Sequence, residues 1–220
     1  MQASADRGKI YKKNTPVIYE KVLKDSEKFN FEIERLGEPS HPNPIIRSGY
    51  TSDDERIAFS SQVVNIFQQI ESCKKFPSFE KAGMREKLFH DPKGTKAAII
   101  TCGGLCPGLN NVIKGLVSEL EIEYGIKDVI GIRYGYLGLS KKSKHEPVDL
   151  KLIHIDQIHK QGGTVLGSSR GNQDPIDMVD QLVSRNINVL FCIGGDGTLK
   201  GAKAIAEEIK KRELNINVVG

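Results

Sequence analysis

The sequence repeats one pattern: a short apolar run, a glycine-rich turn, and then apolar residues at helical spacing. The run 97–100 precedes such a turn and the helical pattern 112–120. The run 189–193 precedes the turn 194–198 and the helical pattern 202–209. Apolar runs this short are typical of parallel strands that are covered on both faces. The repetition therefore predicts an α/β fold with a doubly wound, mostly parallel sheet and right-handed crossovers.

Strands and helices are expected to alternate regularly from residue 96 onward. In such a sheet the turns that follow the strands lie at one edge, where ligands bind. The expected strands are Ala97–Thr101, Asp128–Ile132, Val189–Ile193 and a further strand from Asn217. The expected helices are Asn110–Tyr124, a short one within 150–160, one that Asp174 caps and Pro175 begins, and Leu199–Arg212.

The first glycine turn has the features of an anion site. Gly103, Gly104 and Gly108 allow positive φ angles and leave room for a ligand to approach the backbone. The helix that follows presents free N–H groups and the positive end of its dipole, which favours phosphate. A tight α/β connection that needs glycine only for packing is the alternative interpretation of this turn.

The second turn adds a carboxylate, Asp196, to its glycines. A carboxylate beside a phosphate site repels the anion unless a cation lies between them, so Asp196 is interpreted as a Mg²⁺ ligand, direct or through water. A helix N-cap is the alternative role, and both roles are compatible. In the turn 162–171, Arg170 suits a phosphate group, and Ser168 and Ser169 can donate to the same oxygens. The alternative for Arg170 is an ordinary surface ion pair.

Composition excludes several classes of function. The 32 basic and 28 acidic residues give a net charge of only +4, and the lysines are scattered, so no nucleic-acid partner is expected. Neither a membrane span nor a signal peptide is expected. Cysteines stand at 73, 102, 106 and 192 and are interpreted as small apolar residues in a reducing compartment. A zinc site is not expected, because no other cysteine pair or nearby histidine completes four ligands.

Residues 1–95 differ in character from the rest of the chain. They are charged, contain the helix-breaking stretch 41–44, and carry at 51–55 a pattern typical of a capped helix start. We expect a mainly irregular and helical N-terminal extension that packs on the main domain or on a neighbouring subunit, or else a partly ordered arm. The expected domains are therefore 1–95 and 96–220, the second being a nucleotide-binding α/β domain.

Four glycine motifs, in order and spacing, resemble the 6-phosphofructokinases, and in particular the branch with a long N-terminal extension found in protists, plants and some bacteria. The segment 82–92 also resembles that branch, so the resemblance covers roughly 82–220, with the earlier extension matching only in kind. The Gly-Gly-Asp-Gly-Thr turn alone would be weak evidence, because NAD kinases and lipid kinases share it. The four motifs are 102–110, 135–139, 162–171 and 194–198.

The resemblance implies transfer of the γ-phosphoryl group of ATP, with Mg²⁺, to the 1-hydroxyl of fructose 6-phosphate. Arg133 and Gly201 match positions lining the nucleotide pocket, with a weaker correspondence. Gly197 stands where pyrophosphate-dependent relatives tend to have Asp, which favours ATP as the donor. The positions matching the family's nucleotide site are Gly103, Arg170, Gly171, Gly195, Asp196, Gly197 and Thr198, with Asp196 at the metal position.

The resemblance also places the family's catalytic aspartate, and its later residues for the sugar phosphate, beyond Gly220. The chain is therefore expected to be the nucleotide half of such an enzyme, inactive alone and containing no catalytic base. The protein is expected to be a dimer or tetramer. The expected compartment is the cytoplasm, with a peroxisome-like organelle as the alternative. The alternatives are a pyrophosphate-dependent relative and a non-catalytic nucleotide-binding or regulatory subunit.

Overall fold

The computed structural model describes residues 30–46, 49–72 and 76–220. Two compact units divide the chain: Met1–Arg35 with Arg47–Glu86, and Leu36–Ile46 with Lys87–Gly220. The second unit thus includes segments that precede residue 96, and the domain boundary at 95/96 stays a prediction. In the described part of the chain, no helix is long and apolar enough to cross a membrane.

A five-stranded sheet forms the centre of the second unit, in the order β7-β6-β5-β8-β9. β5 pairs in parallel with both β6 and β8, and β8 pairs in parallel with β9, so the prediction of a mostly parallel sheet is confirmed. β7 is antiparallel to β6 and was not expected, because two residues are too few to show a pattern. The strands are β5 Lys96–Thr101, β6 Asp128–Ile132, β7 Val148–Asp149, β8 Val189–Ile193 and β9 Asn217–Val219.

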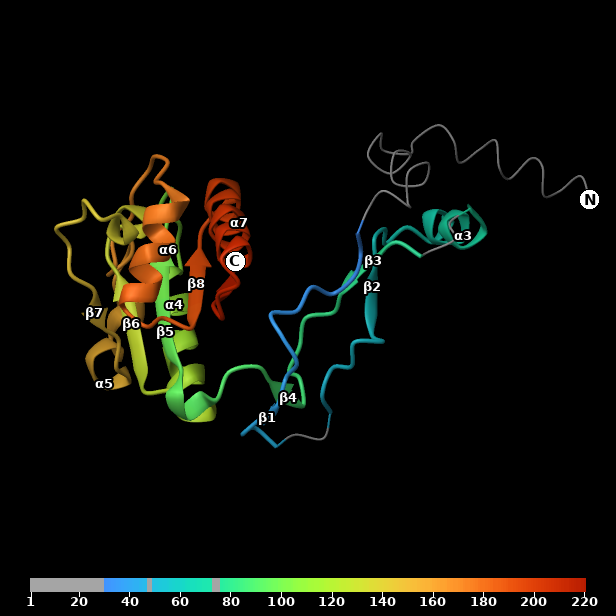
Figure 1. Cartoon of the computed structure of the whole chain (residues 1–220), viewed down its shortest axis with the longest axis horizontal. Coiled ribbons are helices and arrows are strands. Elements are labelled where there is room, and N and C mark those ends of the chain that lie inside the picture. Colours follow the sequence, from blue (N-terminus) through green and yellow to red (C-terminus); the bar gives the residue numbers. More distant parts are fainter. Residues whose placement is uncertain (1–29, 47–48, 73–75) are drawn as a thin grey trace, which may run out of the picture. The chain divides into compact units, whose positions relative to one another are not determined.

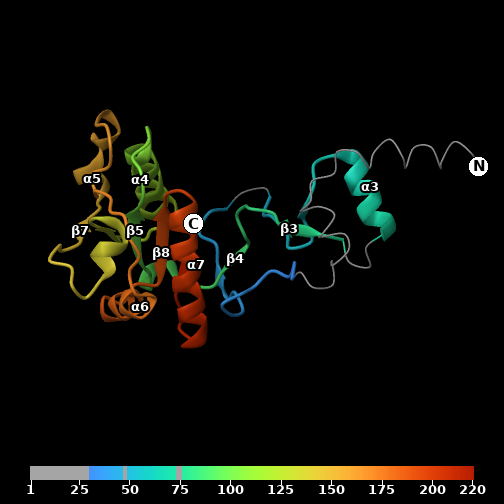
Figure 2. The same cartoon turned by 90° about the horizontal axis from the view of Figure 1, so that it is seen from above.

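Helices cover both faces of this sheet, with α4 and α5 on one side and α6 and α7 on the other (Figure 2). The central strand β5 explains this arrangement, because its alternate residues enter two separate cores. Ala97 and Ile99 pack with the α4 side, and Ala98 and Ile100 pack with the α6 and α7 side. All four side chains are fully buried. The helices are α4 Leu109–Ser118, α5 Leu152–Ile155, α6 Pro175–Ser184 and α7 Asp196–Lys211.

Helix boundaries differ from the expected ones at three places. The expected helix Asn110–Tyr124 is α-helical only to Ser118, and its last part, η4 Glu119–Glu123, is π-helical. The expected helix within 150–160 divides into α5 and the 3₁₀ turn η6 Ile158–Lys160. Helix α7 begins at Asp196 instead of Leu199, since the glycines in its first turns have low helix propensity and conceal the start.

The start of α6 agrees with the expected capping. The Asp174 carboxylate accepts a hydrogen bond from the main-chain N–H of Ile176 at 2.9 Å, and Pro175 is the first helical residue. Two more 3₁₀ segments, η3 Pro92–Gly94 and η5 Gly135–Leu139, and the antiparallel pair β1 His41–Pro42 with β4 Lys87–Leu88 complete this unit.

The first unit has little regular structure. β2 Arg56–Ala58 pairs antiparallel with β3 Ser78–Glu80, and α3 spans Val63–Ser72. The expected helix start at 51–55 is wrong: the segment forms a turn that leads into β2. The N–H of Ser52 donates to the Glu55 carboxylate at 3.0 Å, as in a capping box, but the chain then becomes extended to pair with β3.

Candidate functional site

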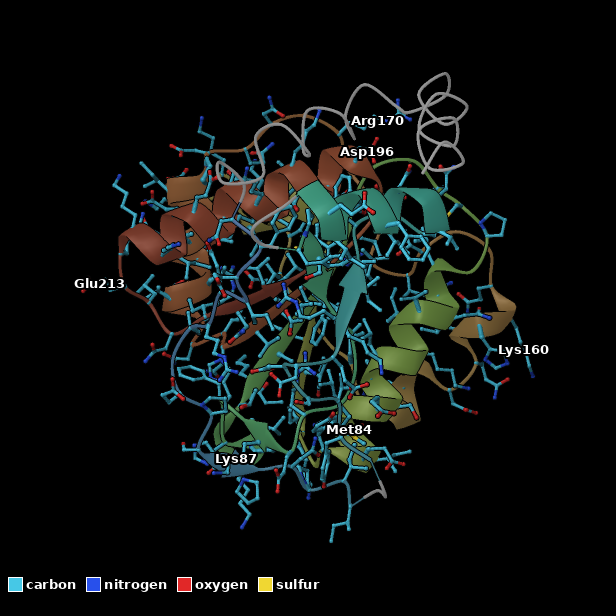
Figure 3. All side chains as sticks on the ribbon, turned by 90° about the vertical axis from the view of Figure 1, so that its right-hand side faces the viewer. Met84, Lys87, Lys160, Arg170, Asp196 and Glu213 are labelled. Carbon is cyan, nitrogen blue, oxygen red and sulfur yellow. The ribbon has the colours of Figure 1, made fainter. Side chains whose placement is uncertain are left out.

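The candidate site lies at the carboxyl ends of β5 and β8, where the turns after these strands lead to opposite faces of the sheet. The β5 turn leads to α4 on one face of the sheet, and the β8 turn leads to α7 on the opposite face. Such a switch point leaves a crevice at the carboxyl ends of the strands. Figure 1 shows β5 and β8 side by side, and in Figure 3 the labelled Arg170 and Asp196 lie next to each other at this end of the sheet.

A cavity of about 340 Å³ occupies this crevice. The seven residues that match the family's nucleotide site all line it, although they come from three separate parts of the chain. The lining residues are Cys102, Gly103, Gly104, Tyr136, Ser169, Arg170, Gly171, Asn172, Gly195, Asp196, Gly197 and Thr198. Their individual roles in binding stay predictions.

A second cavity, of about 500 Å³, adjoins the first. The two cavities share Gly103, Gly104, Ser169 and Arg170, so these residues stand between them. Most of the remaining lining belongs to the glycine-rich segment 162–168.

Glycine is required at two positions of the β5 and β8 turns for different reasons. Gly103 has φ +84°, a conformation that other residues rarely adopt. At Gly194, an added Cβ would lie 2.7 Å from the carbonyl oxygen of Cys102 and 2.1 Å from the Thr198 hydroxyl oxygen. At Gly197, by contrast, an added Cβ would meet no atom within 4 Å. The space beside Gly197 is therefore open.

Helix α7 begins with its N-terminus directed at the cavity. Gly195 is the N-cap and has no side chain to cap the helix, and Asp196 is the first helical residue. The alternative role of Asp196 as N-cap is therefore wrong. Among the described residues, no hydrogen bond occupies the main-chain N–H of Asp196 or Gly197. Such free donors, together with the helix dipole, favour an anion.

The Asp196 carboxylate is exposed and has no ion pair or hydrogen bond in the described part of the chain. No group of three His, Cys, Asp or Glu side chains that could hold a metal occurs among the described residues. A Mg²⁺ held by Asp196 would therefore take its other ligands from phosphate oxygens and water. Mg²⁺ commonly binds in this way, through one or two carboxylates and the phosphates of a substrate. The donor set fits the ion.

Arg170 is exposed at the rim of both cavities. The alternative of an ordinary surface ion pair is wrong for the described residues, where no acidic side chain lies within 4 Å of its guanidinium. One of its terminal nitrogens lies 3.8 Å from the position that a Cβ on Gly104 would take. Its planar fork is thus free to bind a phosphate bidentately.

The two serines before Arg170 do not have the role expected of them. The hydroxyl of Ser168 donates to the carbonyl of Gly103 at 2.5 Å, and that of Ser169 donates to the carbonyl of Tyr134 at 2.6 Å. A hydroxyl has one proton to donate, so neither serine can donate to an anion in this arrangement. The sequence could not show this, because both acceptors are main-chain atoms distant in the chain.

Arg133 and Gly201 do not line either cavity. The Arg133 guanidinium lies over the ring of Tyr134, 5.6 Å from its centroid. Gly201 gives space to Tyr136, because an added Cβ would lie 2.5 Å from that ring. Of the two, only Gly201 contacts a cavity-lining residue here, namely Tyr136.

Tyr136 lines the cavity but was not among the expected site residues. It is buried, and its hydroxyl donates to the carbonyl of Thr198 at 2.6 Å. Burial, and then the neighbouring Cys192 thiol, raise the pKa of this phenol above its usual value. The hydroxyl therefore stays protonated and keeps donating. Its place in the Gly-Tyr-Leu-Gly turn after β6 was the available signal.

The cysteines only partly follow the expectation. Cys102 and Cys192 are buried, and burial raises the pKa of their thiols to about 11 and about 12. Cys106 is exposed, so its interpretation as a buried apolar residue is wrong. Cys106 stands in the turn between β5 and α4, where residues 104–108 are all exposed. Cys73 lies outside the described residues.

Comparison with known proteins agrees with this geometry. The family model for phosphofructokinase matches residues 96–220. The chain is 43% identical over 204 residues to an ATP-dependent 6-phosphofructokinase from Borreliella burgdorferi, covering 89% of this chain and 44% of that protein. It is 50% identical over 141 residues to ATP-dependent 6-phosphofructokinase 5, chloroplastic, from Arabidopsis thaliana. That match covers 64% of this chain and 26% of the relative. The coverage of 89% means that the similarity extends into the region before residue 82.

A solved structure supports the fold. The chain resembles a pyrophosphate-dependent phosphofructokinase from Marinobacter aquaeolei with a TM-score of 0.50 at 20% identity, covering 56% of this chain and 32% of that one. The chain spans less than half the length of the curated relatives it matches. The sheet order, the glycine turns and these matches together show that the chain belongs to the phosphofructokinase family.

Proposed function

We propose that this chain carries the Mg·ATP-binding part of an ATP-dependent 6-phosphofructokinase. The whole enzyme would transfer the γ-phosphoryl group of ATP to the 1-hydroxyl of fructose 6-phosphate and form fructose 1,6-bisphosphate. The observation that carries this proposal is that all seven residues expected at the nucleotide line one cavity of about 340 Å³. Relatives that are 43% and 50% identical are named ATP-dependent 6-phosphofructokinases, which supports the choice of reaction.

Each part of the cavity has a chemical role in this proposal. The free N–H groups at the start of α7 would bind phosphate oxygens, the Gly103 turn would leave room for them to approach, and Arg170 would neutralise their charge. Asp196 would hold Mg²⁺ against the same oxygens. Phosphoryl transfer depends mainly on such positioning and neutralisation, so no acid or base is required from these residues.

The open space beside Gly197 supports ATP over pyrophosphate as the donor. No atom lies within 4 Å of the position that a Cβ would occupy there. An α-phosphate could use this space, and an aspartate at the same position would fill it with a like charge. A pyrophosphate-dependent activity is the second candidate, and assays with each donor distinguish the two.

The test has two parts. The first is the intact mass of the polypeptide that cells make, which decides whether the 24.3 kDa chain occurs alone or within a longer protein. The second is a fructose 1,6-bisphosphate assay on that natural protein, with ATP, pyrophosphate and no donor. ATP-dependent product supports the proposal. Mg·ATP binding without product from any tested donor would favour the non-catalytic nucleotide-binding alternative.

The partners and compartment follow from the same proposal. ATP and fructose 6-phosphate would be the ligands of the whole enzyme, which we expect to be a dimer or tetramer. Cytoplasm is the expected compartment, although one relative is named chloroplastic. Size-exclusion chromatography with light scattering measures the oligomer directly.

A further inference from the structure

The loop 162–171 carries Arg170 to the rim of both cavities. The loop itself contains no helix or strand. A loop of this kind cannot aim a long side chain unless other parts of the fold hold it. We propose that Ser168 and Ser169 are positioning residues, whose hydroxyls fix the loop to two separate turns and thereby aim Arg170. This inference rests on the proposed anion-binding function of the cavity.

The first attachment joins the loop to the turn after β5. The Ser168 hydroxyl donates to the carbonyl of Gly103 at 2.5 Å, and the N–H of Gly103 donates to the carbonyl of Ser169 at 3.4 Å. Gly103 is thus held through both of its main-chain polar groups by two consecutive residues of the loop. The two bonds fix the distance between the Gly103 turn and the peptide that precedes Arg170.

The second attachment joins the loop to the turn after β6. The Ser169 hydroxyl donates to the carbonyl of Tyr134 at 2.6 Å, and the N–H of Tyr134 donates to the carbonyl of Leu166 at 2.8 Å. Tyr134 has φ +60° and ψ +38°, a left-handed conformation that costs energy for a residue with a side chain. Such a conformation persists where the surroundings determine it, and here the loop bonds both of its main-chain polar groups.

Buried contacts hold the base of the loop. Leu166 is fully buried, and the buried Thr101 hydroxyl bonds the carbonyl of Gly167 at 2.7 Å. Asn110 is buried too and accepts from the N–H of Val165 at 2.9 Å. Between Gly167 and Arg170, the two serines provide the side-chain attachments among the described residues. Removing either hydroxyl should therefore release the part of the loop that carries Arg170.

The geometry separates this role from direct ligation of an anion. A hydroxyl has one proton to donate, and each serine hydroxyl donates it to a main-chain carbonyl of another turn. In this arrangement neither serine donates to an anion, and both hold the loop that carries Arg170. Holding the site in shape in this way is preorganisation.

Trypsin cleavage after Arg170 measures the freedom of the loop without any ligand. Arg170 and Lys93 are both exposed and both followed by glycine, so cleavage after Lys93 is a matched internal reference. In Ser168→Ala and in Ser169→Ala, the ratio of the Arg170 rate to the Lys93 rate should rise about three- to tenfold, as expected for losing one hydrogen bond. Ser168→Thr, which keeps the hydroxyl, should restore the ratio toward its original value.

Ser184→Ala is the matched control, because the Ser184 hydroxyl also donates to a carbonyl, that of Gln181, but in α6 away from the cavity. An unchanged ratio in both Ser168→Ala and Ser169→Ala would overturn the proposal. Thermal unfolding of each variant identifies global unfolding, and the two serines act through different acceptors, so one unstable variant leaves the other to decide.

Titration with Mg·ATP gives the second measurement. If the serines position Arg170, Ser168→Ala weakens Mg·ATP binding and also speeds ligand-free cleavage. If they bind the phosphate directly, binding weakens with no change in ligand-free cleavage, which contradicts the proposal. If the unchanged chain does not bind Mg·ATP at all, the proposed nucleotide role of this chain fails, while the cleavage result still decides whether the serines hold the loop.

Discussion

The hydroxyl of Tyr136 donates a hydrogen bond to the main-chain carbonyl of Thr198 at 2.6 Å. This bond joins the turn after β6 to the first turn of α7, and Gly201 leaves the space that the tyrosine ring needs. The start of α7 is therefore held by the turn after β6. A rigid helix N-terminus can bind phosphate without ordering its backbone at that moment.

Asp196→Asn should remove the advantage that Mg²⁺ gives to ATP binding. The amide keeps the size of the carboxylate but lacks its charge, and Asp196 has no partner among the described residues whose loss would disturb the fold. We expect Mg·ATP affinity to fall about ten- to a hundredfold, with metal-free ATP affinity unchanged or higher. Calorimetric titration with and without Mg²⁺ measures both.

The control for Asp196→Asn is Asp149→Asn, which removes a carboxylate that pairs with Lys151 at the surface. A full Mg²⁺ advantage in Asp196→Asn would show that another group holds the ion.

Gly197→Asp should leave the fold intact and weaken ATP binding. An added side chain at Gly197 meets no atom within 4 Å, and Asp is tolerated in the first turn of a helix. Its carboxylate would occupy the open space and repel phosphate, so ATP affinity should fall about tenfold or more. ATP titration and urea unfolding check the two statements. Unchanged ATP affinity would contradict the steric argument for ATP as the donor.

Gly194→Ala, unlike Gly197→Asp, should destabilise the fold, because its Cβ would lie 2.7 Å from the carbonyl oxygen of Cys102. The main chain must move, at a cost of about 1–3 kcal/mol in the free energy of unfolding. Urea unfolding of Gly194→Ala beside Gly197→Ala measures this difference. Equal stabilities would mean that the β8 turn is less tightly packed than these contacts indicate.

Gly131 and Leu166 should be coupled in stability. A Cβ on Gly131 would lie 2.3 Å from a methyl carbon of Leu166, which is fully buried. Gly131→Ala alone should cost about 1–3 kcal/mol by overpacking, and Leu166→Ala alone about 2–5 kcal/mol. The double variant should be more stable than the added losses of the two single variants predict, because the alanine methyl group then enters space that the leucine has vacated. A double-mutant cycle by urea unfolding gives the coupling.

His90 should make stability depend on pH. Burial lowers the pKa of His90 below its ordinary value of 6.5, and nearby His41 acts in the same direction, although the hydrogen bond to Asn217 opposes them. The fold thus favours neutral His90. Its contribution is fully present above pH 6.5, the unfolded value, and is lost as the pH falls below it toward the folded pKa. His90→Gln should flatten the stability profile between about pH 5 and 7. An unchanged slope would assign this dependence to other groups.

The described cysteines should react at very different rates. The pKa values of Cys102 and Cys192 are raised to about 11 and about 12 by burial, so both thiols stay protonated and shielded. Cys106 is exposed. At pH 8, iodoacetamide should modify Cys106 well before the other two in the folded protein, as peptide mass spectrometry can follow. Comparable rates for Cys106 and Cys192 would indicate that the sheet opens locally.

Much of the second unit could be predicted from the sequence because its signals are local. Four buried residues in a row at 97–100 require cover on both faces, which specifies a parallel strand in a doubly wound sheet. Asp174 followed by Pro175 specified the start of α6. The glycine turns placed Gly103, Arg170 and Asp196 at one edge of the sheet, and the cavity contains all three. Periodicity and turn chemistry carry this information without tertiary contacts.

Tertiary structure alone decided how the site is held together. The acceptors of Ser168 and Ser169 are the carbonyls of Gly103 and Tyr134, which lie 65 and 35 positions away in the chain. No pattern marks a main-chain carbonyl as the partner of a particular hydroxyl, because every residue has one. The segment 51–55 failed as a helix start for a related reason: its local hydrogen bonds formed, but pairing of β2 with β3 decided the conformation that followed. Residue types thus determined what the site contains, and long-range packing and hydrogen bonding determined which of those groups remain free to bind a ligand.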